Sequence, residues 1–249
     1  MADARKLAAA ALLRVEADGG YSNIVLNSAL NTSEISHADR ALASALFYGV
    51  LDRRITIDWL LSKHIKTPLK KVAPYTLTVL RCAVYQIAFM EKIPESAAVN
   101  EAVKLIKASG ERRNAAFVNA VVRNIIRTGT DLPYGNDVRT LSVRYSCPEW
   151  IVKSFINDYG EENAVELLSQ SLKTPPVTVR VNTVRTTPER LIKILEENNV
   201  KAAGTETENA LTISITGDIT ALLPYKEGLF HIQDTASQTA AAVLAPKSG

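Results

Sequence analysis

The sequence of 249 residues has little of what metal sites, disulfide frameworks and membrane anchoring require. Its only cysteines, Cys82 and Cys147, are far apart, and its three histidines show no ligand spacing. It contains no glycine-rich phosphate loop, no GxSxG sequence and no Walker sequence. No apolar run approaches the roughly 20 residues of a membrane span. We therefore expect a cytoplasmic chain without a metal site.

The composition is that of a folded protein. Hydrophobic residues make up 47% and charged residues 22% of the chain, which argues against extensive disorder. The length exceeds that of a typical single domain. One large domain or two modest ones are expected.

The net charge of +3 conceals an asymmetry. Residues 1–130 hold 18 Lys and Arg against 11 Asp and Glu, whereas residues 131–249 hold 11 against 15. A basic first half suits a polyanionic partner such as RNA. A solvated surface with an incidental excess of cations explains the same numbers, so charge alone leaves both interpretations open.

Helical periodicity dominates residues 1–130. Gly19 and Gly20 interrupt the first helix, Ser36 stands three residues before Asp39 as in a capping box, and Gly129 follows the last apolar position. The apolar positions from Leu42 to Leu61 suggest either one helix or two, the alternative being a break near Arg53 and Arg54. The pattern predicts an all-α bundle, followed by a linker at 131–139 that is rich in turn residues.

The second half changes period. Residues 148–172 continue as helices, but Val177, Val179 and Val181 alternate with polar residues as in a half-buried strand. A helix is expected after Thr187, and residues 211–215 and 230–232 read as further strands. The sequence thus predicts a mainly α protein with a smaller α+β part.

Two groups of residues are candidate nucleic-acid contacts. Clustered cations are what phosphate binding needs, because each neutralised phosphate releases counterions. Such a cluster gathers around one predicted helix junction: Arg40, Arg53, Arg54, Lys63, Lys66, Lys70 and Lys71.

The second group is the polar face of the strand Thr178–Asn182, where Arg180 could grip a phosphate and Asn182 a base edge or sugar. A salt bridge for Arg180 and a turn-starting role for Asn182 are the structural alternatives. Asn100 and Asn119 interrupt apolar helices and are interpreted as structural residues that cap or bridge neighbouring helices.

Five strings in the first half are distinctive: Ser36-His-Ala-Asp-Arg40, Tyr48-Gly-Val-Leu-Asp-Arg53, Val84-Tyr-Gln-Ile87, Ile93-Pro-Glu-Ser-Ala-Ala-Val-Asn-Glu101 and Phe117-Val-Asn-Ala-Val-Val-Arg123. Together they closely resemble the NusB-like RNA-binding domain. That domain occurs in transcription antitermination factors and at the front of bacterial ribosomal RNA (cytosine-5)-methyltransferases of the Fmu/Sun/RsmB type.

Later strings resemble the methyltransferase and have no counterpart in a stand-alone antitermination factor. They are Arg144-Tyr-Ser-Cys-Pro-Glu-Trp150, Pro176-Val-Thr-Val-Arg-Val-Asn-Thr183 and Gly228-Leu-Phe-His-Ile-Gln-Asp-Thr-Ala-Ser-Gln238. The resemblance implies a NusB-like bundle at 1–130, connector helices and a small RRM-like or ferredoxin-like domain at 140–223, and a truncated start of a methyltransferase domain at 224–249. The Rossmann-like remainder of that domain is expected to be absent.

The resemblance also implies a function for the parent protein. It would transfer a methyl group from S-adenosylmethionine to carbon 5 of a cytosine in small-subunit ribosomal RNA. This segment would position the RNA, bind no cofactor and be inactive by itself. Neither Cys82 nor Cys147 receives a catalytic role.

Other functions stay open at this point. A stand-alone antitermination regulator explains residues 1–130 and leaves the rest unexplained. A module that docks another protein through its helical bundle, and an enzyme of unknown chemistry, are the further alternatives.

Overall fold

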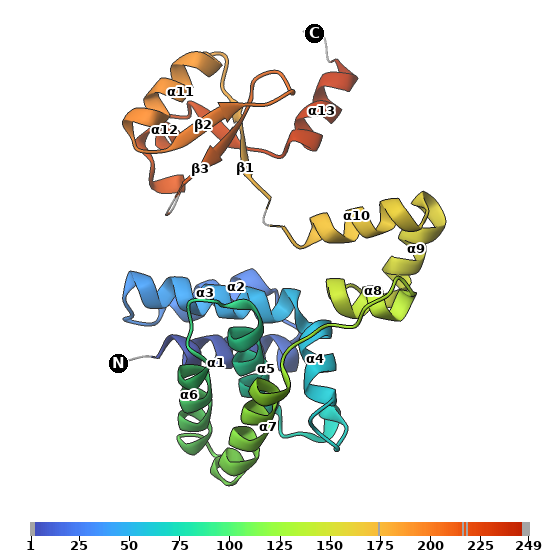
Figure 1. The fold of residues 1–249 in the computed structure, drawn as a ribbon. Helices are drawn as coiled ribbons and strands as arrows, with labels where there is room; N and C mark the ends of the chain where they lie inside the picture. Colours follow the sequence, from blue (N-terminus) through green and yellow to red (C-terminus); the bar gives the residue numbers. More distant parts are fainter. Residues whose placement is uncertain (1–2, 174, 216, 218, 246–249) are drawn as a thin grey trace. The chain divides into compact units, whose positions relative to one another are not determined.

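The chain forms two compact units, Met1–Leu172 and Lys173–Gly249, in the computed structural model (Figure 1). The structure describes residues 3–173, 175–215, 217 and 219–245. Over these residues the first unit is helical and the second combines helices with one small sheet. This confirms the mainly α, partly α+β fold that the sequence predicts.

A bundle of helices, connected by short segments, makes up most of the first unit. Two short 3-10 turns, η1 (Leu69–Lys71) and η2 (Arg112–Asn114), lie between its helices. Over the described residues the bundle consists of α1 (Ala4–Asp18), α2 (Ser22–Asn31), α3 (His37–Asp52), α4 (Arg54–Ser62), α5 (Pro74–Phe89), α6 (Glu95–Lys107) and α7 (Ala115–Thr128).

Local signals in the sequence set the helix boundaries. The Ser36 hydroxyl accepts a hydrogen bond from the Asp39 backbone N–H at 3.1 Å and donates one to the Asp39 carboxylate at 2.7 Å, which caps α3. Arg53 separates α3 from α4, in agreement with the two-helix alternative. Gly129 ends α7 with a φ of 83°, a left-handed value that favours glycine.

Helix α5 is the centre of the bundle and packs against α1, α3, α4, α6 and α7. Its residues 76–84 are all buried, which explains why apolar residues are not confined to one stripe of the helix. Gly49 of α3 is buried against it, because a Cβ atom there would overlap the Tyr85 ring. The Tyr85 ring therefore packs directly on Gly49, and a side chain at position 49 would displace it.

One arginine with its ion-pair partners lies inside this apolar bundle. Arg81 of α5 is 5% exposed, and its guanidinium forms two hydrogen bonds with the Asp58 carboxylate, at 2.7 and 2.8 Å. It also pairs with Glu16 of α1, which in turn contacts Arg54 at 3.0 Å. This network ties α1, α4 and α5 together, and its charges compensate one another.

Three further helices complete the first unit: α8 (Val138–Tyr145), α9 (Glu149–Tyr159) and α10 (Glu161–Ser171). They share a small core, and α8 is joined to α4. The Thr56 hydroxyl donates to the Val143 carbonyl at 2.6 Å, and the Ile55 N–H donates to the Ser146 hydroxyl at 3.1 Å. The linker expected at 131–139 therefore connects two parts of one compact unit.

The second unit contains an antiparallel sheet with the strand order β2-β3-β1-β4. Helix α11 (Pro188–Glu197) connects β1 to β2, and η3 (Ile219–Ala221) and α12 (Leu223–Lys226) lie between β3 and β4. This βαββαβ arrangement is the ferredoxin-like fold. The strands are β1 (Val177–Val181), β2 (Lys201–Gly204), β3 (Ala210–Ser214) and β4 (Phe230–Ile232).

One face of this sheet forms the core of the unit with α11. Phe230 of β4 is fully buried in that core and pairs with Val181 of β1. The sequence ends the α+β domain at 223 and assigns 224–249 to a following domain, whereas the structure places β4 within the sheet. Helix α13 (Thr235–Leu244) follows β4, and residues 246–249 lie outside the described part.

Candidate nucleic-acid interface

The three arginines of the predicted basic cluster all have partners within the protein. Arg40 donates to the Leu30 carbonyl at 2.8 Å and to the Asn31 side chain at 3.3 Å, at the end of α2. The Arg53 guanidinium lies 4.9 Å from the centroid of the Phe89 ring, and Arg54 pairs with Glu16. These side chains hold helices together, so each of the three arginines has a structural role.

The lysines of the same cluster are exposed. Lys70 and Lys71 lie in η1, and their amino groups contact no other described residue. Arg40 and Arg53 lie near opposite ends of α3, whose 16 residues span about 24 Å. Arg40 thus lies apart from Arg53, and RNA contacts by the members of the cluster stay predictions.

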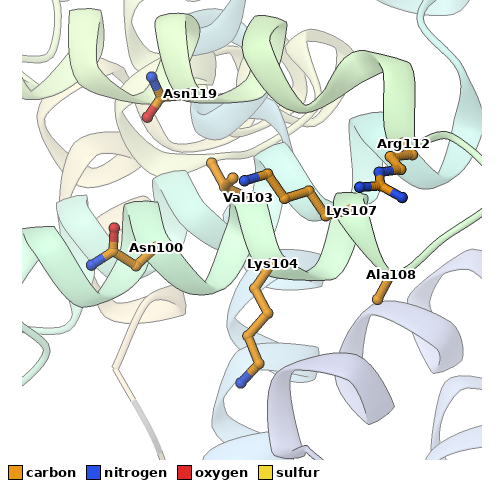
Figure 2. Close-up of a pocket in the computed structure, with 7 residues that line it drawn as sticks. All are labelled: Asn100, Val103, Lys104, Lys107, Ala108, Arg112 and Asn119. Carbon is orange, nitrogen blue, oxygen red and sulfur yellow. The ribbon is translucent and has the colours of Figure 1, made fainter.

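A basic hollow that the sequence does not predict lies between α6 and α7 (Figure 2). Its volume is about 550 Å³. Figure 2 shows Lys107 extending between the two helices and Lys104 directed away from α7. We call this feature the basic hollow; its lining residues are Asn100, Val103, Lys104, Lys107, Ala108, Arg112 and Asn119.

The cations of the basic hollow are only partly neutralised. Lys104 pairs with Glu101 at 3.2 Å, but neither Lys107 nor Arg112 has an ion pair with a described carboxylate. Asn119 accepts a hydrogen bond from Arg123 at 3.0 Å, which leaves its amide N–H groups for another partner. The hollow offers two positive groups and amide donors, and this is a donor set suited to phosphate.

Glu111, the acidic residue next to Arg112 in the sequence, bonds to Thr76 and not to Arg112. The Glu111 carboxylate accepts hydrogen bonds from the Thr76 N–H at 2.9 Å and the Thr76 hydroxyl at 2.5 Å, in the first turn of α5. A carboxylate is favourable at a helix N-terminus, and Asn114 also donates to Thr76 at 3.0 Å. These bonds fix η2 and leave Arg112 facing solvent.

The expectation that Asn100 and Asn119 cap or bridge neighbouring helices is wrong. Asn100 is exposed and has no partner among the described side chains, and Asn119 bonds only to Arg123 of its own helix. The sequence signal for the basic hollow is a local excess of cations. Between residues 95 and 128 there are six Lys and Arg against three Glu, and two of those glutamates are engaged as described above.

The second predicted group divides into two roles. The Asn182 amide donates to the Gly228 carbonyl at 2.8 Å and accepts from the Val184 N–H at 3.3 Å, so it holds a turn at the end of β1. Arg180 is exposed on the open face of β1, and its guanidinium bonds to no described residue. The structural alternative describes Asn182, whereas the salt bridge considered for Arg180 does not form.

Neither thiol is poised for nucleophilic chemistry. Burial raises the pKa of Cys82 to about 12, and burial also raises the pKa of Cys147. The reactive form of cysteine is the thiolate. Both residues are therefore protonated near neutral pH.

Within the described part of the chain, no group of three His, Cys, Asp or Glu side chains could hold a metal ion. The described helices also include none long and apolar enough to cross a membrane. The described residues do not fit S-adenosylmethionine either, because the sheet is antiparallel and no glycine-rich turn leads from a strand into a helix.

The bundle α1–α7 corresponds to a known family. The NusB family matches residues 2–127, which is just over half of the sequence. The chain belongs to the NusB family. A second family, described as Methyltr_RsmF/B-like, ferredoxin-like domain, matches residues 147–220, which include α9, α10 and β1–β3. These matches confirm the resemblance that the sequence strings carry.

Curated relatives match this NusB-family chain over nearly all of its length. It is 34% identical to the "Probable ribosomal RNA small subunit methyltransferase B" of Bacillus subtilis, over 98% of this chain and 55% of the relative. It is 28% identical to a protein of the same name from Synechocystis sp., over 99% of this chain and 56% of the relative. The chain thus spans about half the length of the relatives it matches.

A solved structure supports the fold. The crystal structure of PH0851 matches with a TM-score of 0.71 and 19% sequence identity, over 100% of this chain and 57% of that chain. At this identity the likeness shows the fold alone.

Proposed function

We propose that this NusB-family chain is the RNA-binding part of an S-adenosylmethionine-dependent methyltransferase that forms 5-methylcytosine in small-subunit ribosomal RNA. The order of the two family matches supports the proposal, because a stand-alone antitermination regulator would account for the first match only. The names of the relatives from two organisms support the substrate class. Such an enzyme would work in the cytoplasm, where its ribosomal RNA is.

Methyl transfer is assigned to residues outside this chain. The relatives are nearly twice as long, the described residues do not fit the cofactor, and both thiols are protonated. The chain by itself should therefore bind RNA without modifying it. Incorporation of labelled methyl groups from S-adenosylmethionine into RNA by this chain alone would contradict the assignment.

The observation that carries RNA binding is the basic hollow. Lys107 and Arg112 are exposed cations without a carboxylate partner among the described residues, and they line the same hollow as the amide groups of Asn100 and Asn119. Backbone phosphates bind such clusters and release counterions as they do so. RNA affinity should therefore fall steeply as salt rises.

A salt titration of a single-stranded ribosomal RNA segment tests the proposal. The double variant K107A/R112A should flatten the slope of log affinity against log salt by about 1.4, since each lost contact to single-stranded RNA removes about 0.7. The matched control is R139A/K153A, which removes two exposed cations from α8 and α9 of the same unit. An unchanged slope in K107A/R112A, or an equal loss of slope in both double variants, would show that the basic hollow is not the binding site.

A further inference from the structure

The second unit has a hollow of its own, where the end of β1 meets β4. Its volume is about 540 Å³, within the range of pockets that hold small ligands. Arg180, Asn182, His231 and Gln233 are among the residues that line it, and its described lining includes no Asp or Glu. We call this feature the strand hollow.

Two side chains without protein partners face each other in the strand hollow. Arg180 of β1 and His231 of β4 are direct partners in the antiparallel ladder, so they project from the same face of the sheet. Cβ atoms of such partners lie about 5 Å apart. Both side chains are exposed, and neither the guanidinium nor the imidazole bonds to another described residue.

The backbone around this pair is held in place. Asn182 bonds to the Gly228 carbonyl, and Arg185 donates to the Glu227 carbonyl at 2.6 Å, which together fix the segment that leads into β4. Beyond β4, the Gln233 N–H donates to the Thr178 carbonyl at 3.1 Å. The positions of Arg180 and His231 are therefore set before any ligand arrives.

The chemistry of this pair matches one nucleotide. A guanidinium binds phosphate through two parallel hydrogen bonds, and an imidazole ring can stack on an unpaired base. The neighbouring residues on the same face, Thr178 and Thr212, are not aromatic, so the face has no extended stacking platform. The pair suits a single nucleotide rather than a run of stacked bases.

We propose that the strand hollow is a subsite for one nucleotide of single-stranded RNA, with a phosphate on Arg180 and the adjoining base stacked on His231. This inference rests on the proposed RNA-binding function and adds a contact from the α+β unit. Asn182, which the sequence predicts as an RNA contact, becomes a positioning residue, because its amide is engaged in the turn.

Fluorescence anisotropy with a short labelled single-stranded RNA tests the subsite in the full chain. R180A should weaken binding and flatten the salt slope by about 0.7. H231A should weaken binding at least about fivefold, whereas H231F should retain affinity because phenylalanine still stacks on a base. Both positions are exposed, so the thermal midpoints of the three variants should match that of the wild type.

The control is K201A. Lys201 of β2 is paired with Ser214 on the same face of the sheet but lies at the opposite edge from β4. The K201A substitution removes a cation without touching the strand hollow, so it should leave RNA affinity nearly unchanged. If the wild-type chain binds RNA but R180A and H231A bind equally well, the subsite is refuted while the RNA-binding function stands. If the wild-type chain binds no RNA at low salt, the proposed function itself fails and the subsite with it.

Discussion

The basic hollow and the strand hollow differ in how the chain places their side chains. In the helical unit, Lys107 and Arg112 come from α6 and η2, and long flexible side chains bring charge without a fixed spacing. In the α+β unit, Arg180 and His231 are set opposite each other by ladder hydrogen bonds. Helices here supply charge density, which suits phosphates of any sequence, whereas the sheet supplies a defined spacing, which suits a phosphate and its base.

The cores of the two units also differ in their content of charged residues. The helical unit buries Arg81 among compensating carboxylates, whereas the core cluster of the α+β unit consists of apolar side chains. The two units should therefore respond separately to mutation. Both tryptophans, Trp59 and Trp150, lie in the helical unit, so tryptophan fluorescence reports that unit alone, while far-UV circular dichroism reports both.

The largest effect is expected from Phe230→Ala. Removing a fully buried phenylalanine from a small core costs about 4 kcal/mol of unfolding free energy. In urea titrations, circular dichroism should show early loss of the α+β unit, while the tryptophan transition stays in place. Ile232→Ala in the same strand, where the side chain is 49% exposed, serves as the control and should have a much smaller effect. A shifted tryptophan transition in Phe230→Ala would show that the two units unfold together.

Arg81→Ala should produce the converse result. It leaves the carboxylates of Glu16 and Asp58, which are 23% and 29% exposed, without their shared cation. Breaking buried ion pairs costs about 3 kcal/mol at the low end of the observed range, which applies because both carboxylates keep some solvent. The tryptophan transition should move to lower urea. Arg14→Ala is the matched control, since its pair with Asp18 is exposed and contributes almost nothing.

The smallest effect separates the two residues of the polar strand. Asn182→Ala removes two hydrogen bonds of the turn after β1 and should destabilise the α+β unit by about 1–2 kcal/mol. Arg180→Ala removes no hydrogen bond or ion pair with a described residue and should leave the stability of that unit unchanged. Chemical denaturation followed by circular dichroism measures both. Equal stability of the two variants would show that the Asn182 bonds contribute little in solution.

Strong local signals made most of the fold predictable. The Ser36 capping box, the break at Arg53 and the alternation of Val177, Val179 and Val181 are each decided by neighbouring residues, and the structure agrees at each. Helix α8 and strand β2 were missed. The sequence of α8 lies next to a turn-rich segment, and β2 is a short edge strand, Lys-Ala-Ala-Gly, that has no alternation of apolar and polar residues.

The candidate sites were less predictable, because they depend on partners distant in sequence. The sequence does not show that Arg40 bonds to the end of α2. It also does not show that Asn182 bonds to Gly228. The Arg180–His231 pair joins residues 51 positions apart, and only the β1–β4 register reveals it. Proximity in the sequence grouped Arg40 with Arg53, which the fold places near opposite ends of α3. It did not reveal the basic hollow at α6 and η2.

The short strand β4 has a practical consequence for dissecting the chain. It covers the outer hydrogen-bonding edge of β1, so a recombinant fragment that ended at residue 223 would leave that edge unpaired and remove Phe230 from the interior. Bare strand edges recruit other chains and aggregate. An isolated version of this module should therefore extend through Gln238, whose side chain donates to the Gln233 carbonyl at 3.0 Å and secures the segment after the strand.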